Sequence, residues 1–278
     1  MKRARLRGFT LVELVIVIVI TGILSGMVAV FLRTPVQSYV DTAARAELTD
    51  VADLALRRLA RDVRLALPNS VYVSPDRKML QFLLVKTGGR YVDISDAPPA
   101  SLLPLDFSPS ANLSFDLAGA APSGRQQIQV NDYIVVFNIG TAPADAYTSG
   151  NIARVTAVSG TRITMANNPF ATASPSMPSP SNRFQVVTGT VTYVCAPVAG
   201  GGGTLTRNYS SAIFGPNGLG APPYGTPALL AKKVSDCGFD YTVLANANAA
   251  LVGMSLTLTR DNGESVKLSR QVHVDNTP

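Results

Sequence analysis

Apolar and polar residues follow three successive patterns along this chain, and the first predicts a membrane-spanning helix. Between Phe9 and Leu32 the sequence is apolar, interrupted only by Thr10, Glu13, Thr21 and Ser25. A helix rises by about 1.5 Å per residue, so this segment reaches roughly 36 Å and can cross a hydrocarbon core of about 30 Å with some tilt.

The second pattern, over residues 33–68, predicts that the helix continues in amphipathic form. Apolar residues recur every three or four positions, which is the period of one helical face. That face holds Leu48, Ala52, Ala55, Leu59, Val63 and Ala66, and the other holds Arg45, Glu47, Asp50, Asp53, Arg57, Arg61 and Arg64. Pro68-Asn69 is predicted to end a helix of about 55–60 residues, with a bend at Pro35 where it leaves the membrane. The second half is expected to lie on a sheet.

The third pattern has a period of two and predicts strands. They are expected at 71–73, 79–85, 91–94, 113–117, 128–138, 152–158, 161–166, 184–195, 204–209, 229–234, 239–243, 250–260 and 265–274. Asn262-Gly263 predicts a tight hairpin between the last two. The expected fold class is therefore α+β, with a long N-terminal helix packed on an antiparallel β-sheet.

Stretches rich in Pro, Gly and Ser at 95–125 and 171–182 suggest how the body is divided. Residues 69–125 are expected to hold the first strands and loops. Residues 126–182 are expected to form a small inserted β subdomain with a flexible linker, and residues 183–278 a C-terminal antiparallel sheet.

The charges around the apolar segment predict its orientation and single out one acid. Lys2, Arg3, Arg5 and Arg7 precede it, which predicts a cytoplasmic N-terminus and a body outside. Glu13 costs about 2.5–3.5 kcal/mol if it reaches the middle of the membrane, and no cation lies within 9–32. It is either a surface acid reaching the headgroups or an acid awaiting a partner.

Cleavage between Gly8 and Phe9 would create such a partner, an α-amine one helical turn before Glu13 and within reach of a neighbouring chain's Glu13. Gly8 suits a cleavage site because it keeps the backbone accessible. An ordinary secretory signal is cut after its apolar core. Cleavage here would instead leave the apolar helix on the mature protein.

The order of a basic leader, Gly8, Phe9, the string T-L-V-E-L at 10–14 and an apolar run resembles the class III signal of type IV pilins and type II secretion pseudopilins. The resemblance implies that residues 1–8 are a leader removed at Gly8–Phe9 by prepilin peptidase, and that Phe9 is N-methylated with retention of its charge. It also implies that Glu13 pairs with the Phe9 amine of an adjacent subunit and sets the axial register.

The same resemblance implies the partners and the location. The partners would be prepilin peptidase with its N-methyltransferase activity, other major and minor pilins, and an inner-membrane assembly platform. The chain would be a single-pass inner-membrane protein with a periplasmic body before assembly, and part of a pilus at the cell surface afterwards. Gly22 and Gly26 have the G-x-x-x-G spacing of closely packed helices, although glycine is common in membrane helices in any case.

Composition and motifs argue against nucleic-acid binding and catalysis. The chain has 24 Lys and Arg against 18 Asp and Glu, a net charge of +6; removal of the leader's four cations leaves 20 against 18, or +2. The basic character is thus mostly leader and does not indicate nucleic acid. No nucleotide-binding, zinc-protease or serine-hydrolase motif is present, and His273 is the only histidine. We expect no enzyme, catalytic residue, metal or cofactor.

Cys195 and Cys237 are the two cysteines, and both lie in the predicted outer body. An oxidising periplasm makes a disulfide the default. It would close a loop of about 40 residues and stabilise the fold by roughly 3–4 kcal/mol. Two buried free thiols or a metal pair are the alternatives, and the metal pair lacks suitable ligand spacing.

Short strings near the end are similar to those of larger minor pilins. They are L-T-R-N-Y at 205–209, D-C-G-F-D-Y at 236–241 and R-Q-V-H-V-D-N-T-P at 270–278. They resemble minor pilins of the mannose-sensitive haemagglutinin (MSHA) pilus, with J-type pseudopilins and W-type minor pilins as near relatives. This implies a low-copy structural subunit involved in pilus biogenesis. A minor pseudopilin of a type II secretion system is one alternative. A tip adhesin or ligand-binding module on a pilin stalk, with residues 126–182 as the binding unit, is another.

Overall fold

The computed structural model describes residues 8–108, 112–148, 150–215, 225–244 and 248–278. The chain divides into two compact units, residues 1–50 and 51–278. Lys2, Arg3, Arg5 and Arg7, which carry the orientation argument, lie outside the described residues.

One helix, α1, extends over Leu11–Val63 and belongs to both units. It continues through Pro35, so the helix prediction is confirmed, while a bend at Pro35 stays a prediction. The expected end at Pro68 is wrong, because the residues after Val63 join the sheet. The backbone N–H of Leu67 donates to the Leu83 carbonyl (2.8 Å), and that of Val85 donates to the Leu65 carbonyl (2.8 Å).

Among the described residues, eleven strands form one hydrogen-bonded network in which every neighbouring pair is antiparallel. This confirms the predicted α+β class. The strands are β1 (Tyr72–Val73), β2 (Met79–Arg90), β3 (Ser114–Asp116), β4 (Tyr133–Val135), β5 (Ile152–Ser159), β6 (Arg162–Met165), β7 (Arg183–Ala196), β8 (Gly203–Ser210), β9 (Thr226–Val243), β10 (Ala249–Thr259) and β11 (Ser265–Asp275).

Three strand predictions need correction. Residues 91–94 are not a strand, because a short 3-10 helix, η1 (Ile94–Asp96), begins there with Asp93 as its cap. Within 128–138 the strand is shorter than predicted and covers Tyr133–Val135, although the N–H groups of Asn131 and Val136 still donate to the carbonyls of Val155 and Asn151. Residues 229–234 and 239–243 belong to a single long strand, β9. Its first part, up to Val234, pairs with β8, and its second part, from Val234 to Val243, pairs with β10.

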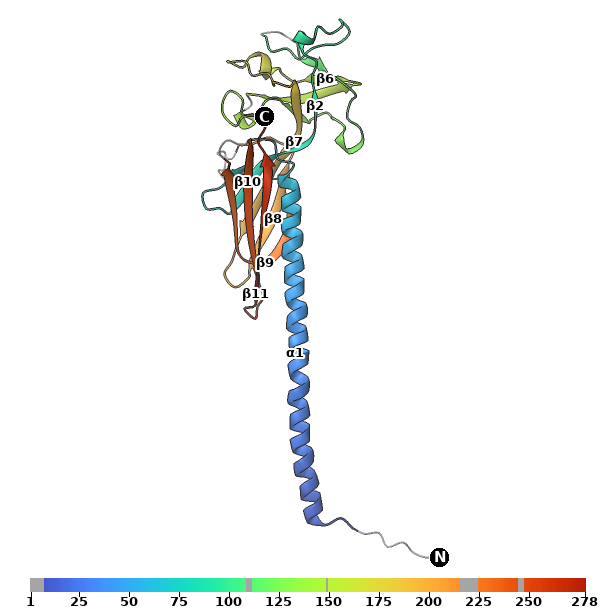
Figure 1. Cartoon of the computed structure of the whole chain (residues 1–278), viewed down its shortest axis with the longest axis vertical. Helices are drawn as coiled ribbons and strands as arrows, with labels where there is room; N and C mark the ends of the chain where they lie inside the picture. The colour runs from blue at the N-terminus through green and yellow to red at the C-terminus, as the bar shows by residue number, and fades with distance from the viewer. Residues whose placement is uncertain (1–7, 109–111, 149, 216–224, 245–247) are drawn as a thin grey trace, which may run out of the picture. The chain divides into compact units, whose positions relative to one another are not determined.

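The long strand β7 connects the two halves of the sheet. Its residues 190–196 pair with β8, its residues 185–187 pair with β4, and β2 pairs along its other edge. Figure 1 shows β8–β11 side by side and β2 and β7 continuing beyond them toward β6. Because the backbone pairing is continuous, β2 and β7 tie both halves into one unit.

Within the second unit, the last turns of α1 lie on the sheet. Ala52, Ala55, Leu59 and Val63 are buried, as the periodicity predicted. The buried Asp62 accepts hydrogen bonds from Tyr193 Oη on β7 (2.9 Å) and from Arg207 Nε on β8 (2.5 Å). Burial, together with the Asp62 carboxylate, raises the pKa of Tyr193, so the phenol stays protonated and donates.

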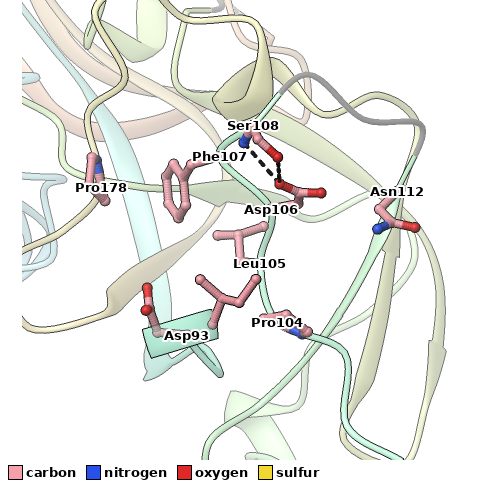
Figure 2. A pocket seen from close by; sticks show the side chains of 9 residues that line it. Asp93, Pro104, Leu105, Asp106, Phe107, Ser108, Asn112 and Pro178 are labelled. Carbon is pink, nitrogen blue, oxygen red and sulfur yellow. Dashed lines mark hydrogen bonds between the residues drawn. The ribbon is translucent and has the colours of Figure 1, made fainter. Parts of the chain in front are cut away.

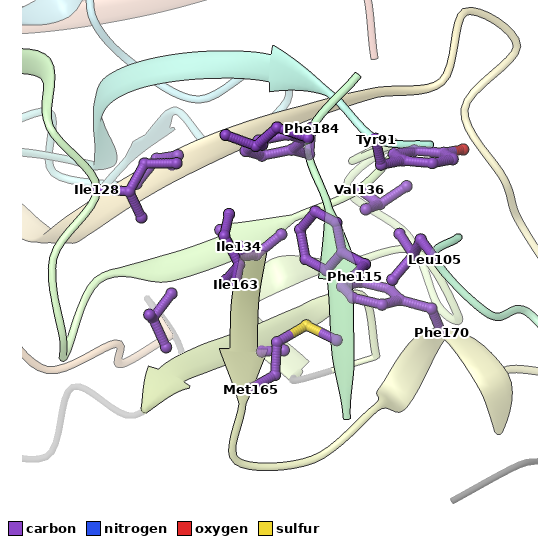
Figure 3. Packing of buried hydrophobic residues seen from close by; sticks show 14 residues of the cluster. Tyr91, Leu105, Phe115, Ile128, Ile134, Val136, Ile163, Met165, Phe170 and Phe184 are labelled. Atoms are coloured by element: carbon purple, nitrogen blue, oxygen red, sulfur yellow. The ribbon is translucent and has the colours of Figure 1, made fainter. Parts of the chain in front are cut away.

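A second hydrophobic core lies around β3–β6 and the adjoining end of β7 (Figure 3). Phe115 packs edge-on against Phe184 with ring centroids 5.6 Å apart. The cluster combines predicted insert residues such as Ile134 and Ile163 with Tyr91, Phe115 and Phe184 from outside the insert. The predicted boundaries at 126 and 182 stay a proposal.

Candidate processing and assembly site

The predicted cleavage site lies immediately before the first helical turn. Gly8, Phe9 and Thr10 are exposed and outside the helix, and Phe9 is 80% exposed. A Cβ atom built on Gly8 would have no neighbour within 4 Å. A protease needs an accessible, non-helical backbone, and this stretch provides one on both sides of the Gly8–Phe9 bond.

Thr10 caps the helix and places Glu13 in its first turn. The Thr10 side-chain oxygen accepts a hydrogen bond from the Glu13 backbone N–H (3.3 Å), and the Thr10 carbonyl accepts from Leu14 N–H (3.2 Å). Thr10 and Glu13 therefore have the T-x-x-E spacing of a capping box. This capping role of Thr10 was not predicted above, although the T-x-x-E spacing is visible in the sequence.

The position of Glu13 in the first helical turn lowers the free-energy cost of placing its carboxylate in the membrane. A carboxylate in the first helical turn faces the unpaired N–H groups and the positive end of the helix dipole. This interaction offsets part of the desolvation cost of the acid. Over the part of the chain that the structure describes, no ion pair is formed by the Glu13 carboxylate. Its pairing with a neighbouring amine stays a prediction.

The helix after Glu13 has an apolar surface that this chain does not bury. The window Leu11–Val28 has a mean hydropathy of 2.6 and is 0% buried, and it is long and apolar enough to cross a membrane. Thr21 Oγ1 donates to the carbonyls of Val17 (2.6 Å) and Ile18 (3.1 Å). Because this hydroxyl is satisfied within its own helix, it adds little cost in lipid.

Gly22 and Gly26 lie one turn apart on this helix. A Cβ at either position would have no neighbour within 4 Å. Contacts within this chain therefore do not explain why glycine stands there, and close packing against another helix stays a prediction.

Cys195 on β7 and Cys237 on β9 are joined in a disulfide, with their Cα atoms 6.5 Å apart. Both residues are buried in the second unit. The bond links two strands that lie on either side of β8. His273 is exposed on β11, opposite Leu251. Among the described residues, no three His, Cys, Asp or Glu side chains gather in a group that could hold a metal.

In comparison with known protein families, the N-terminal segment matches a family model. Residues 3–29 match the family model of the prokaryotic N-terminal methylation motif. Searches of curated proteins and of solved structures found no match. The motif spans most of the leader, the Gly8–Phe9 bond and the apolar helix up to Ala29, and it does not extend to the body. It supports a type IV pilin-like protein that carries a class III signal, is anchored by its N-terminal helix, and undergoes prepilin-peptidase processing and assembly with other pilins.

Proposed function

We propose that this chain is a minor, low-copy structural subunit of a type IV pilus-like fibre and takes part in starting its assembly. The observation that carries the proposal is the methylation motif at 3–29, located on a helix whose apolar surface is unburied and whose first turn holds Glu13. Membrane anchoring would account for the apolar surface, and helix capping would account for an acid in the first turn. The match to the methylation motif is what adds processing and assembly to these two roles.

The proposed sequence of events begins with hydrolysis of the Gly8–Phe9 bond. Water adds across the peptide, the leader leaves with a new carboxylate at Gly8, and Phe9 keeps a new α-amine that is then N-methylated. The methylated amine stays positively charged at neutral pH. It supplies the cation that the segment from Phe9 to Leu32 lacks.

Assembly then exchanges lipid for protein around the helix. The exposed side chains of Leu11–Val28 would contact helices of neighbouring subunits, and apolar contacts would replace apolar contacts at little cost. Pairing of Glu13 with the Phe9 amine of an adjacent subunit would set the axial register. A charged pair in a dry environment is strongly favoured over two separate charges.

The location and partners follow from the same segment. The leader cations support a cytoplasmic N-terminus. The body would then lie on the periplasmic side of the inner membrane before assembly and on the pilus afterwards. Prepilin peptidase, other major and minor pilins and an inner-membrane assembly platform are the proposed partners.

The most specific parts of the proposal are the low-copy role and the particular pilus system. They are supported by the large second unit, residues 51–278, and by the strings similar to the MSHA minor pilin MshO at 205–209, 236–241 and 270–278. A type II secretion pseudopilin would share the same N-terminal chemistry. The identity of the other pilin-like proteins that co-purify with this chain separates the two assignments.

Mass spectrometry of the protein purified from membranes tests the processing step. The expected N-terminal peptide begins at Phe9 and carries one methyl group on its amine. A protein that retains Met1, or one cut beyond Leu32, contradicts the proposal. A Gly8→Val variant is the matched control, since a branched side chain beside the bond is expected to block cleavage and leave membrane insertion intact.

A further inference from the structure

A pocket of about 500 Å³ opens in the second unit, on residues that the proposed assembly role does not use (Figure 2). Its lining comes from η1, from the chain segment around Leu105 and from Pro178. Pro178 is distant in sequence from the other lining residues, which lie between Asp93 and Asn112. A volume of this size is in the range of sites that hold a small molecule or a few side chains.

The inner surface of the pocket is apolar and held in place by the core behind it. Leu105 is 3% exposed and belongs to the hydrophobic core around β3–β6. Phe107 packs against Tyr91 and Phe170, with ring centroids 5.6 and 6.2 Å apart. At the edge, Ile94 is 77% exposed although it is a large apolar side chain. A partner that covered Ile94 would remove apolar surface from water.

Two carboxylates stand beside this apolar surface. Asp93 Oδ1 accepts a hydrogen bond from Ser95 N–H (2.7 Å), and Asp106 Oδ1 accepts one from Ser108 N–H (2.9 Å); the second of these is drawn in Figure 2. No Lys, Arg or His is present among the described residues that line the pocket. The pocket is therefore both apolar and negatively charged.

We propose that this pocket binds an arginine side chain, flanked by an apolar residue, that a partner protein presents. A guanidinium is planar and weakly hydrated, forms paired hydrogen bonds with carboxylates, and stacks on aromatic rings. Asp93 and Asp106 supply the charge and Phe107 supplies the ring. The apolar neighbour of the arginine would cover Ile94, which a free small cation would leave exposed. This inference is independent of the N-terminal segment.

Titration with a matched pair of peptides tests the proposal on the full chain in detergent micelles. The probes are acetyl-Leu-Arg-Leu-amide and the same peptide with citrulline, which has nearly the shape of arginine without its charge. With ¹⁵N-labelled protein, the arginine peptide is expected to shift the amide signals of Ile94 and Phe107 and to bind at least tenfold more tightly than the citrulline peptide. Equal binding of the two peptides, or shifts confined to other regions, would overturn the proposal.

Two variants separate charge from structure. Asp93→Asn and Asp106→Asn keep an oxygen for the Ser95 and Ser108 N–H groups and remove the negative charge. Each is expected to weaken binding of the arginine peptide about tenfold, the effect of losing one charged hydrogen bond, and to leave the citrulline peptide unaffected. Asp261→Asn, in the exposed turn between β10 and β11, is the control and should bind as the unaltered chain does.

Two further outcomes are decisive. If both aspartate variants bind the arginine peptide as tightly as the unaltered chain, the carboxylates do not recognise it and the proposal fails. If a variant does not fold, as judged by its amide spectrum, the comparison of arginine with citrulline on the unaltered chain still decides the question. Failure of either kind would not affect the proposed pilin function, which the N-terminal mass tests separately.

Discussion

At the scale of single residues, Glu13 is a position where helix capping and the proposed assembly role coincide. It lies in the first turn of α1 behind the Thr10 cap, where the helix N-terminus stabilises a negative charge. Glu13 also follows Phe9 by four positions in the sequence, and the backbone nitrogen of Phe9 would become the terminal amine on the proposed cleavage. A capping side chain needs a hydrogen-bond acceptor, whereas the proposed pairing with an amine needs a negative charge.

Two substitutions separate these properties. Glu13→Gln keeps the capping-box pattern and removes the charge, whereas Glu13→Val removes both. We expect both variants to insert in the membrane and both to be incorporated into fibres at least tenfold less than the unaltered protein, because neither can pair with an amine. Immunoblots of sheared fibres and of membranes measure the two steps. Normal incorporation of Glu13→Gln would show that the pairing model is wrong.

Asp116 gives a pH-dependent prediction in the body. Its carboxylate, 2% exposed, accepts from Arg162 Nη2 (2.7 Å) and Leu103 N–H (2.8 Å). Hydrogen bonding to Arg162 holds the pKa of Asp116 below its ordinary value of 3.8. A carboxyl with a lowered folded-state pKa contributes stability that is present above the unfolded-state pKa. That stability is lost as pH falls through the folded-state value.

Asp116→Asn should therefore lower the free energy of unfolding by about 2 kcal/mol at pH 7, and the difference should shrink as the pH falls below about 4. Urea unfolding followed by near-UV circular dichroism at pH 7, 5 and 3 measures it. Asp261→Asn in an exposed turn is the control and should change little at any pH. An undiminished difference at pH 3 would show that the charge of Asp116 is not the cause.

At the scale of elements, the disulfide and β7 hold the sheet together. Cys195 and Cys237 are 42 positions apart and link β7 to β9. A double Cys195→Ser, Cys237→Ser variant is expected to lose about 3 kcal/mol of stability, since a closed loop of that length restricts the unfolded chain. Denaturant unfolding with and without reductant measures this. Reductant should destabilise the unaltered protein by a similar amount and leave the double variant unchanged; destabilisation of both would point to another cause.

The helix ends where the sheet begins, and this could not be predicted from helical periodicity. Residues 64–67 continue the apolar spacing, yet Ala66 forms a bridge with Leu84. Backbone groups at the end of a helix need partners, and the edge of β2 offers them.

Strand β9 contains a second local feature that periodicity does not predict. Lys233 has a positive φ of 60°, which is an irregularity within a strand that is otherwise paired along its length.

At the scale of the whole molecule, the shared core around β3–β6 determines what a deletion would do. Tyr91, Phe115 and Phe184 lie outside residues 126–182 but pack with residues inside that range. Deletion of 126–182 is therefore expected to expose these rings and to lower the thermal midpoint of the remaining body by at least 10 °C, a loss of several kcal/mol. Calorimetry and limited proteolysis measure this. A deletion variant with an unchanged midpoint would instead support an independent insert.

The N-terminal features could be recognised from the residues alone: the apolar helix, the Gly8–Phe9 bond and the acid at position 13. These features need no tertiary contacts, because lipid and a processing enzyme act on a contiguous stretch of chain. The period-two pattern likewise located most strands, since alternation reflects a sheet with one buried face.

Strand pairing and the contacts between side chains became known from the three-dimensional fold. The division of β7 between β8 and β4, the contact of Asp62 with Tyr193 and Arg207, and the gathering of Asp93, Asp106 and Phe107 around one pocket all join residues that are distant along the chain. Such contacts depend on the register of strand pairing and on packing at close range. A local pattern of apolar and polar residues does not encode either of them.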